Sequence, residues 1–195
     1  EDLRQAAADR LAELIGANDD RLNTGFLATG MLLPVLADHG HADLAYRLLL
    51  RTGQPSWLGM LEAGATTMWE YWDGIASDGQ VKGSLDHYSK GAVASFLHTH
   101  VAGLRLPEFP TSDEAGYRRI RVAPVLGGGI TSASTVQDTV AGRIEISWRV
   151  DRGTFVLDLD LPRGVIADVE LPDGRAYVAS AGRSEASCPL PHNAV

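Results

Sequence analysis

The hydrophobic period of this chain changes once, at the polar and proline-containing segment 107–113, and this change constrains the fold more than any other feature. Before the segment, apolar residues recur at intervals of three and four, which places them on one face of a helix. After it, apolar and polar residues alternate, as in a strand with one buried face. The sequence therefore predicts several antiparallel helices followed by a small all-β domain.

The helical half contains about five segments with this spacing. They run through Leu3 to Ile15, Phe26 to Leu36, Ala42 to Arg51, Trp57 to Glu62 and Leu85 to Leu104. Such hairpins match part of an (α/α)6 toroid, but a closed toroid needs about twelve helices because each hairpin contributes two. The chain also begins at Glu1 rather than at a methionine. We therefore expect a processed product or a piece of a longer polypeptide, with much of the barrel outside these residues.

Four short runs in the second half alternate between apolar and polar residues, namely 119–122, 144–150, 155–161 and 167–171. Turn signals such as Asp151-Arg152-Gly153 and Pro172-Asp173-Gly174 separate them. Short strands without intervening helices predict an antiparallel β-sandwich. The predicted organisation is a helical domain over 1–106 and a β-sandwich domain over 107–195, the latter ending in a loose tail from Arg183 to Val195.

Composition excludes some partners. The 25 acidic residues outnumber the 17 basic ones and are spread along the chain, so neither nucleic acid nor an anionic membrane is an expected partner. No apolar run approaches the roughly 20 residues that a membrane span needs. A single cysteine, Cys188, allows no intrachain disulfide and leaves the cellular compartment undetermined.

No metal site and no cofactor are expected. The histidines in His39-Gly40-His41 and in His98-Thr99-His100 are two positions apart, whereas a helical ligand face needs a spacing of three or four.

The most informative stretch is Trp69-Glu70-Tyr71-Trp72, which lies between Gly64 and Gly74. A carboxylate between two indoles can stack on a sugar ring and place an acid or base beside it. The alternative is an aromatic core cluster with a carboxylate that reaches solvent. These residues alone leave both interpretations open.

Four local patterns, in order, resemble the bacterial α-L-rhamnosidases of glycoside hydrolase family 78. They are Thr24-Gly25-Phe26-Leu27, Asp43-Leu44-Ala45-Tyr46, the run from Pro55-Ser56-Trp57 to Trp69-Glu70, and Ser84-Leu85-Asp86-His87-Tyr88. The resemblance covers essentially the whole chain. It implies the end of an (α/α)6 catalytic barrel followed by a C-terminal β-sandwich, and hydrolysis of terminal α-L-rhamnosides with inversion.

Inversion requires a general acid and a general base on opposite faces of the sugar. By resemblance the general base is Glu70, whereas nothing here matches the family's general-acid motif. Glu62 is the competing base, and its structural alternative is a helix-end acid bonded to backbone amides near Gly64. A base must be ionised yet partly desolvated, and we expect an amide or a hydroxyl, such as that of Thr66 or Thr67, to steady it.

The resemblance also implies residues that bind the sugar. We expect one of Trp69 and Trp72 to pack in the barrel and the other, Trp72, to touch sugar, with Trp57 a further candidate whose alternative is core packing. His87 resembles a histidine that bonds a rhamnose hydroxyl; its alternative is a structural bond at a helix start. Two positions depart from the commoner pattern: Asp86 stands where Asn is usual, and Lys90 where an apolar or aromatic residue is usual.

The expected partners are a rhamnosylated glycoside or polysaccharide and the missing N-terminal part of the same polypeptide. Without the general acid, the chain alone is expected to hydrolyse negligibly, and apolar faces left by an incomplete barrel favour self-association. The rival hypothesis is a non-catalytic module that binds carbohydrate or docks another domain. Another α/α-barrel glycosidase or phosphorylase is a third possibility that fits the motifs less well.

Overall fold

The computed structural model describes residues 3–76 and 78–190. The chain divides into two compact units, Glu1–Phe96 and Leu97–Val195. The predicted domain boundary at 106 and 107 stays a prediction, because compactness alone does not define a domain.

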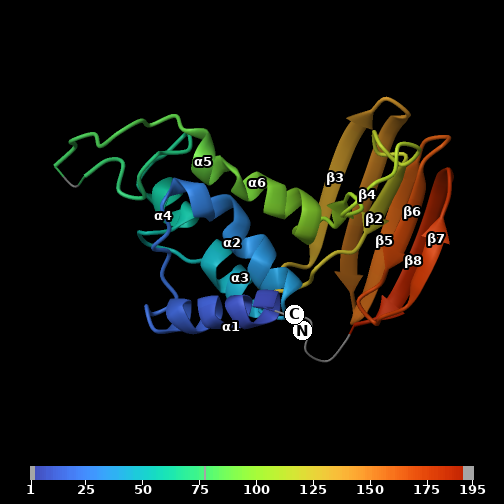
Figure 1. Ribbon diagram of the computed structural model, residues 1–195, viewed down its shortest axis with the longest axis horizontal. Helices are drawn as coiled ribbons and strands as arrows, with labels where there is room; N and C mark the ends of the chain where they lie inside the picture. Colours follow the sequence, from blue (N-terminus) through green and yellow to red (C-terminus); the bar gives the residue numbers. More distant parts are fainter. Residues whose placement is uncertain (1–2, 77, 191–195) are drawn as a thin grey trace. The chain divides into compact units, whose positions relative to one another are not determined.

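The first unit is helical (Figure 1). Its elements are α1 (Leu3–Gly16), α2 (Phe26–Asp38), α3 (Ala42–Leu49), α4 (Trp57–Glu62), α5 (Tyr88–Gly91) and α6 (Val93–Phe96). Helix α2 packs against α1, α3, α5 and α6, so it forms the centre of this unit. Tyr46 on α3 meets Phe96 on α6 edge to face, with ring centroids 5.9 Å apart. Leu33 and Leu36 of α2 are also fully buried, which is the burial that the helical period predicted.

The last predicted helix, from Leu85 to Leu104, is divided in the structure. Helices α5 and α6 are followed by the π-helical turn η1 (Leu97–Val101) and then by a short strand, β1 (Leu104–Arg105). Gly103 adopts φ +91°, a left-handed conformation that ends the helical path before β1. The predicted helical spacing thus corresponds to α5, α6 and η1, whereas residues 85–87 and 102–104 at the two ends of the predicted range are not helical. No helix among the described residues is long and apolar enough to cross a membrane.

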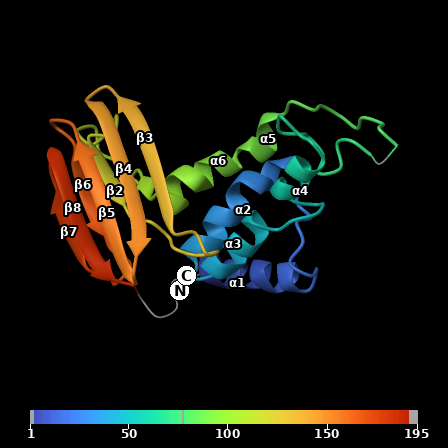
Figure 2. The ribbon, with the colours of Figure 1, turned by 180° about the vertical axis from the view of Figure 1, so that it is seen from behind.

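The second unit holds two four-stranded sheets. Figures 1 and 2 show this unit from opposite sides. The strands after β1 are β2 (Arg119–Val122), β3 (Ser132–Thr139), β4 (Gly142–Asp151), β5 (Thr154–Leu161), β6 (Ile166–Glu170), β7 (Ala176–Ala179) and β8 (Gly182–Pro189). Their orders are β1-β2-β6-β7 and β3-β4-β5-β8. Ile120, Val169, Phe155 and Leu157 belong to one buried cluster that draws on both sheets. The predicted sequence of helices followed by a small two-sheet β unit is confirmed.

Three details of the β unit differ from the predictions. Strands β2 and β6 pair in parallel, so one sheet is mixed; the three strands between them belong to the other sheet. Strand β3 was missed because its sequence, from Ser132 to Thr139, is mostly polar. The predicted loose tail is wrong for Arg183 to Pro189, which pair with β5 along β8. Strand β8 is mostly exposed, so it lacked the apolar alternation of a central strand. Residues 191–195 lie outside the described part of the chain.

Candidate functional site

The candidate site lies in the long connection between α4 and α5. Among its described residues, the only strand-like pairing is the bridge between Ile75 and Val81. Two stretches of this connection lie side by side: the Glu70 amide donates to the Ser84 carbonyl at 2.9 Å, and the His87 amide donates to the Met68 carbonyl at 2.7 Å. These bonds hold the Trp69–Trp72 segment against residues 84–87.

Glu70 is half-buried, and a main-chain donor holds its carboxylate. The Ser84 amide donates to Glu70 Oε2 at 3.0 Å. Gly83 precedes it with φ +67°, and a Cβ there would lie 2.8 Å from Glu70 Oε2 and 2.5 Å from Tyr71 Cε2. A glycine is therefore required beside the carboxylate. The expected amide donor is present, whereas the Thr67 hydroxyl bonds the Leu85 carbonyl instead.

Lys90, a residue that the sequence did not assign to the site, lies beneath this segment. Its side chain is charged and belongs to the short helix α5, yet the residue is only 3% exposed. Its ammonium donates to the Glu70 carbonyl and lies 4.7 Å from the centroid of the Trp72 ring. Burial lowers the pKa of Lys90, while the charges of Glu70 and Asp73 act in the opposite direction. The signal in the sequence was only a lone lysine at an expected apolar position.

The tryptophans fall into two groups. Trp57 and Trp72 meet edge to face with centroids 5.2 Å apart, and Trp57 Nε1 donates to the Lys90 carbonyl at 2.9 Å. Trp69 is 2% exposed and packs on Gly74, where a Cβ would come within 2.9 Å of its side chain. Trp72 is half-buried, and its Nε1 has no hydrogen-bond partner among the described residues. Trp69 and Trp57 therefore have packing roles in this unit, and the sugar contact of Trp72 stays a prediction.

His87 lies at the start of α5, where its ring makes structural contacts. Nδ1 is 2.9 Å from the Ser89 hydroxyl and accepts the Ser89 amide at 3.3 Å, which caps the helix. The ring stacks on Tyr88 with centroids 4.9 Å apart and meets Phe26 edge-on. A hollow of about 190 Å³ beside it is lined by Phe26, Leu27, Gly30, Tyr88, Ser89 and Ala92. The alternative role of His87 as a structural cap is therefore observed, and the bond to a sugar hydroxyl stays a prediction.

Glu62, the competing base, lies apart from this arrangement. It ends α4, is exposed, and accepts the Gly53 amide at 2.9 Å. The amide belongs to Gly53 rather than to a residue near Gly64, but the role is that of the helix-end alternative. The Glu62 carboxylate takes no part in the contacts of Lys90 and Trp72 given above.

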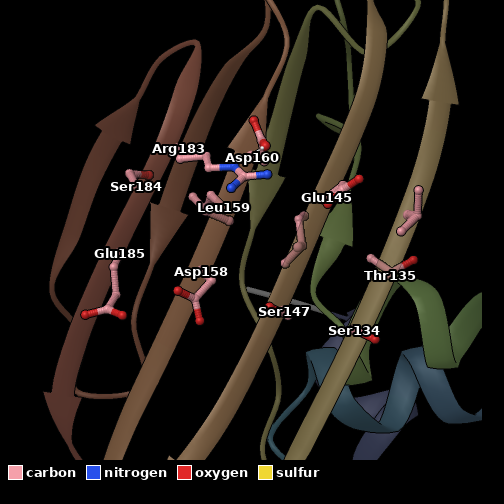
Figure 3. Close-up of a pocket in the computed structure, with 12 residues that line it drawn as sticks. Ser134, Thr135, Glu145, Ser147, Asp158, Leu159, Asp160, Arg183, Ser184 and Glu185 are labelled. Atoms are coloured by element: carbon pink, nitrogen blue, oxygen red, sulfur yellow. Dashed lines mark hydrogen bonds and ion pairs between the residues drawn. The ribbon is translucent and has the colours of Figure 1, made fainter.

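The β unit has its own hollow, of about 450 Å³, on the outer face of the β3-β4-β5-β8 sheet (Figure 3). Arg183 on β8 reaches toward Asp160 on β5 and bonds it at 2.8 Å. On the same sheet face Arg149 donates to Asp158 at 2.6 Å. Arg183 and Asp160 thus pair within the hollow, whereas Asp158 pairs with Arg149, which lies on the same sheet face outside the lining. Across the described residues, no group of three or more His, Cys, Asp or Glu side chains is arranged to hold a metal ion.

Comparison with known proteins identifies both units. Residues 1–101 match the bacterial alpha-L-rhamnosidase 6 hairpin glycosidase domain, and residues 103–185 match the bacterial alpha-L-rhamnosidase C-terminal domain. The helical unit is thus of the six-hairpin glycosidase class. The chain belongs to the bacterial α-L-rhamnosidase family, and corresponds to the part in which the six-hairpin domain is followed by the C-terminal domain.

Individual relatives agree with this assignment. An α-L-rhamnosidase of Streptomyces avermitilis is 42% identical over 174 residues, which are 87% of this chain and 16% of that protein. A crystal structure of Streptomyces avermitilis α-L-rhamnosidase complexed with L-rhamnose superposes with a TM-score of 0.85 at 36% identity, covering 95% of this chain and 20% of the other. The native enzyme from Aspergillus terreus gives 0.85 at 35% identity, with 94% and 21% covered. The chain therefore spans about a fifth, or less, of the length of these relatives.

Proposed function

We propose that this chain contributes part of the catalytic site of an inverting α-L-rhamnosidase, with Glu70 as the general base that activates water. The observation that carries the proposal is the half-buried carboxylate of Glu70, bonded by the Ser84 amide and adjoined by indoles, within a segment of the six-hairpin glycosidase family. The substrate class is a terminal α-L-rhamnoside, which is the specificity in the names of the relatives.

The surroundings of Glu70 suit a base. Its carboxylate has one fixed acceptor position, at Oε2, so Oε1 can accept a proton from a water molecule. The bond from the Ser84 amide fixes the orientation of the carboxylate. In an inverting enzyme the acid lies roughly 6.5–9.5 Å from the base, which leaves room for the water between base and sugar. We assign the acid to a part of the enzyme outside this chain.

The test is a joined enzyme, in which this chain replaces the matching region of the Streptomyces avermitilis α-L-rhamnosidase. Glu70→Gln keeps the shape and the bond to Ser84 but removes the base. We expect turnover of an aryl α-L-rhamnoside to fall by about 10³-fold or more, with substrate binding largely retained. Glu62→Gln is the matched variant, since it makes the same chemical change at the competing carboxylate. A Glu70 variant with unaltered turnover would exclude the base role.

The chain alone provides a second measurement. Without the acid, we expect it to give negligible hydrolysis of the same aryl α-L-rhamnoside. Turnover near that of a full rhamnosidase would mean that the acid lies within these residues.

A second candidate is a non-catalytic module that binds carbohydrate or docks another domain. It is favoured by the exposed apolar side chains of the helical unit, including Leu27 at 80%, Met31 at 62% and Tyr88 at 81% exposure. Sedimentation combined with a hydrophobic-dye assay tests it, because an uncovered docking face binds dye and associates. A dye-negative monomer that also fails to bind L-rhamnose would contradict the module hypothesis.

A further inference from the structure

Burial of Lys90 costs free energy, which contacts of its ammonium must offset. A lysine that is 3% exposed loses most of its hydration, and such a residue is rarely found in an interior without a partner. Here the compensation comes from the Glu70 carbonyl, which accepts a hydrogen bond from Nζ, and from the face of Trp72, 4.7 Å from it. Both partners belong to the segment that carries the candidate base.

The main chain of Lys90 extends this arrangement to a second element. Its carbonyl accepts a bond from Trp57 Nε1 at 2.9 Å, and the Trp57 ring meets Trp72 edge to face. One residue thus links helix α4, helix α5 and the Trp69–Trp72 segment. The segment has no helix or strand of its own in the described residues, so these contacts and the bonds to residues 84–87 determine where Glu70 lies.

We propose that Lys90 is a positioning residue for the base: its buried ammonium fixes the main chain of Glu70 and the ring of Trp72 in the geometry that catalysis requires. This inference rests on the proposed role of Glu70. Lys90 itself transfers no proton and touches no substrate. It acts through the two residues that it holds, and a displacement of about 1 Å at a catalytic group can lower a rate about 100-fold.

The titration of Lys90 gives a readout that does not depend on activity. Lys82 and Lys90 are the only lysines of the sequence, so a chain carrying lysine labelled with ¹³C at the ε carbon gives two resonances, which Lys82→Met and Lys90→Met assign. We expect the pKa of Lys90 to lie below the ordinary value of 10.5, because the side chain is buried. The charge of Glu70 opposes that shift, as does that of Asp73. Glu70→Gln should therefore lower the pKa of Lys90 further.

The same ionisation affects stability with a definite sign. Between the lowered pKa of the folded chain and 10.5, the unfolded chain binds more protons than the folded one. The contribution of Lys90 to stability should therefore rise with pH across that window, and Lys90→Met should lack it. Burial raises the pKa of Tyr177, which contributes a slope of opposite sign in alkaline solution, so the quantity compared is the difference between the slopes of wild type and Lys90→Met. Equal slopes contradict the burial of Lys90, and a Lys90 resonance unaffected by Glu70→Gln contradicts its closeness to Glu70.

Kinetics in the joined enzyme test the positioning role. Lys90→Met should lower kcat about 100-fold with little change in KM, and Lys90→Arg should recover part of the loss because it retains the cation. Lys82→Met is the matched control: Lys82 also lies over an aromatic ring, 4.6 Å from the centroid of Tyr71, but its side chain is 53% exposed. We expect that control to retain wild-type kcat.

The outcomes separate the two proposals. If Glu70→Gln abolishes turnover while Lys90→Met leaves kcat unchanged, the base stands and the positioning role is wrong. If Glu70→Gln is fully active, the base itself is wrong, whatever Lys90 does. If Lys90→Met fails to fold, kcat of Lys90→Arg still tests the positioning role. The Lys90 titration in the wild-type chain still tests the burial of this side chain.

Discussion

The connection that carries Glu70 and the outer face of the β3-β4-β5-β8 sheet are both rich in charge, but they use it differently. On the sheet, guanidinium and carboxylate groups pair with each other across neighbouring strands, as Arg183 does with Asp160. Around Glu70, charged groups bond to main chain and lie on rings: Glu70 accepts the Ser84 amide, and Lys90 of α5 donates to the Glu70 carbonyl. The ion pair of Lys82 with Asp73 is the exposed exception in this connection. The sheet is already fixed by its own ladders, whereas the segment around Glu70 takes its position from these side chains together with two main-chain bonds to Ser84 and His87.

The largest loss of stability is expected from a substitution in the hydrophobic core of the β unit. Phe155 is fully buried, so Phe155→Ala should destabilise the β unit by about 3–5 kcal/mol. The only cysteine, Cys188, is buried on the neighbouring strand directly opposite Phe155. Its reaction with a thiol reagent across a denaturant series therefore reports unfolding of this unit. Val140→Ala, at a side chain that is 86% exposed, is the control and should behave as wild type. An equal loss of stability in Phe155→Ala and Val140→Ala would contradict the role of Phe155 in the core.

The next prediction concerns the connection that carries Glu70. A substitution there should cost less stability than Phe155→Ala but should lower the rate of catalysis. Gly83→Ala places a Cβ in a left-handed conformation, which costs about 1–2 kcal/mol, and drives it against Glu70 and Tyr71. We expect kcat of the joined enzyme to fall about 100-fold while the β unit keeps its stability.

Gly79→Ala is the matched variant for that prediction. Gly79 has φ +81°, but none of the described residues places an atom within 4 Å of the position that a Cβ would take, so the variant shares the backbone cost without the contact. Equal kcat in the two alanine variants would mean that the approach to Glu70 has no role in catalysis.

The same contrast explains how far the sequence could be interpreted. Strands β4 and β5 were predictable because each has one buried face, which imposes alternation on Ile144 to Val150 and Phe155 to Leu161. Strand β3 and strand β8 lie at the edges of their sheet, and β8 exposes most of its residues, so neither pattern was visible. The parallel pairing of β2 with β6 joins segments far apart in the sequence, and local periodicity carries no information on such a pairing.

The candidate site was predictable to a different extent. The order Trp69-Glu70-Tyr71-Trp72 identified the segment, because a carboxylate between indoles is unusual in local sequence. The Ser84 amide could not be anticipated as the partner of the Glu70 carboxylate, since it lies 14 residues further along a connection whose described residues form no helix or strand. Lys90 was equally hidden: a lysine on a four-residue helix is typical of a solvated face, and only the tertiary structure buries it.

The smallest effect is expected at the charged sheet face. The side chains of Arg183 and Asp160 are 87% and 38% exposed, so solvent and salt screen their attraction. Arg183→Gln should leave the denaturation midpoint of the β unit, followed by Cys188 reactivity, almost unchanged, and added salt should abolish any small difference. The backbone pairing of β8 with β5 runs the length of both strands and does not depend on this ion pair. A midpoint shift as large as that of Phe155→Ala would show that side-chain charge, and not the ladder, holds β8 in place, and the contrast with the Glu70 connection would then disappear.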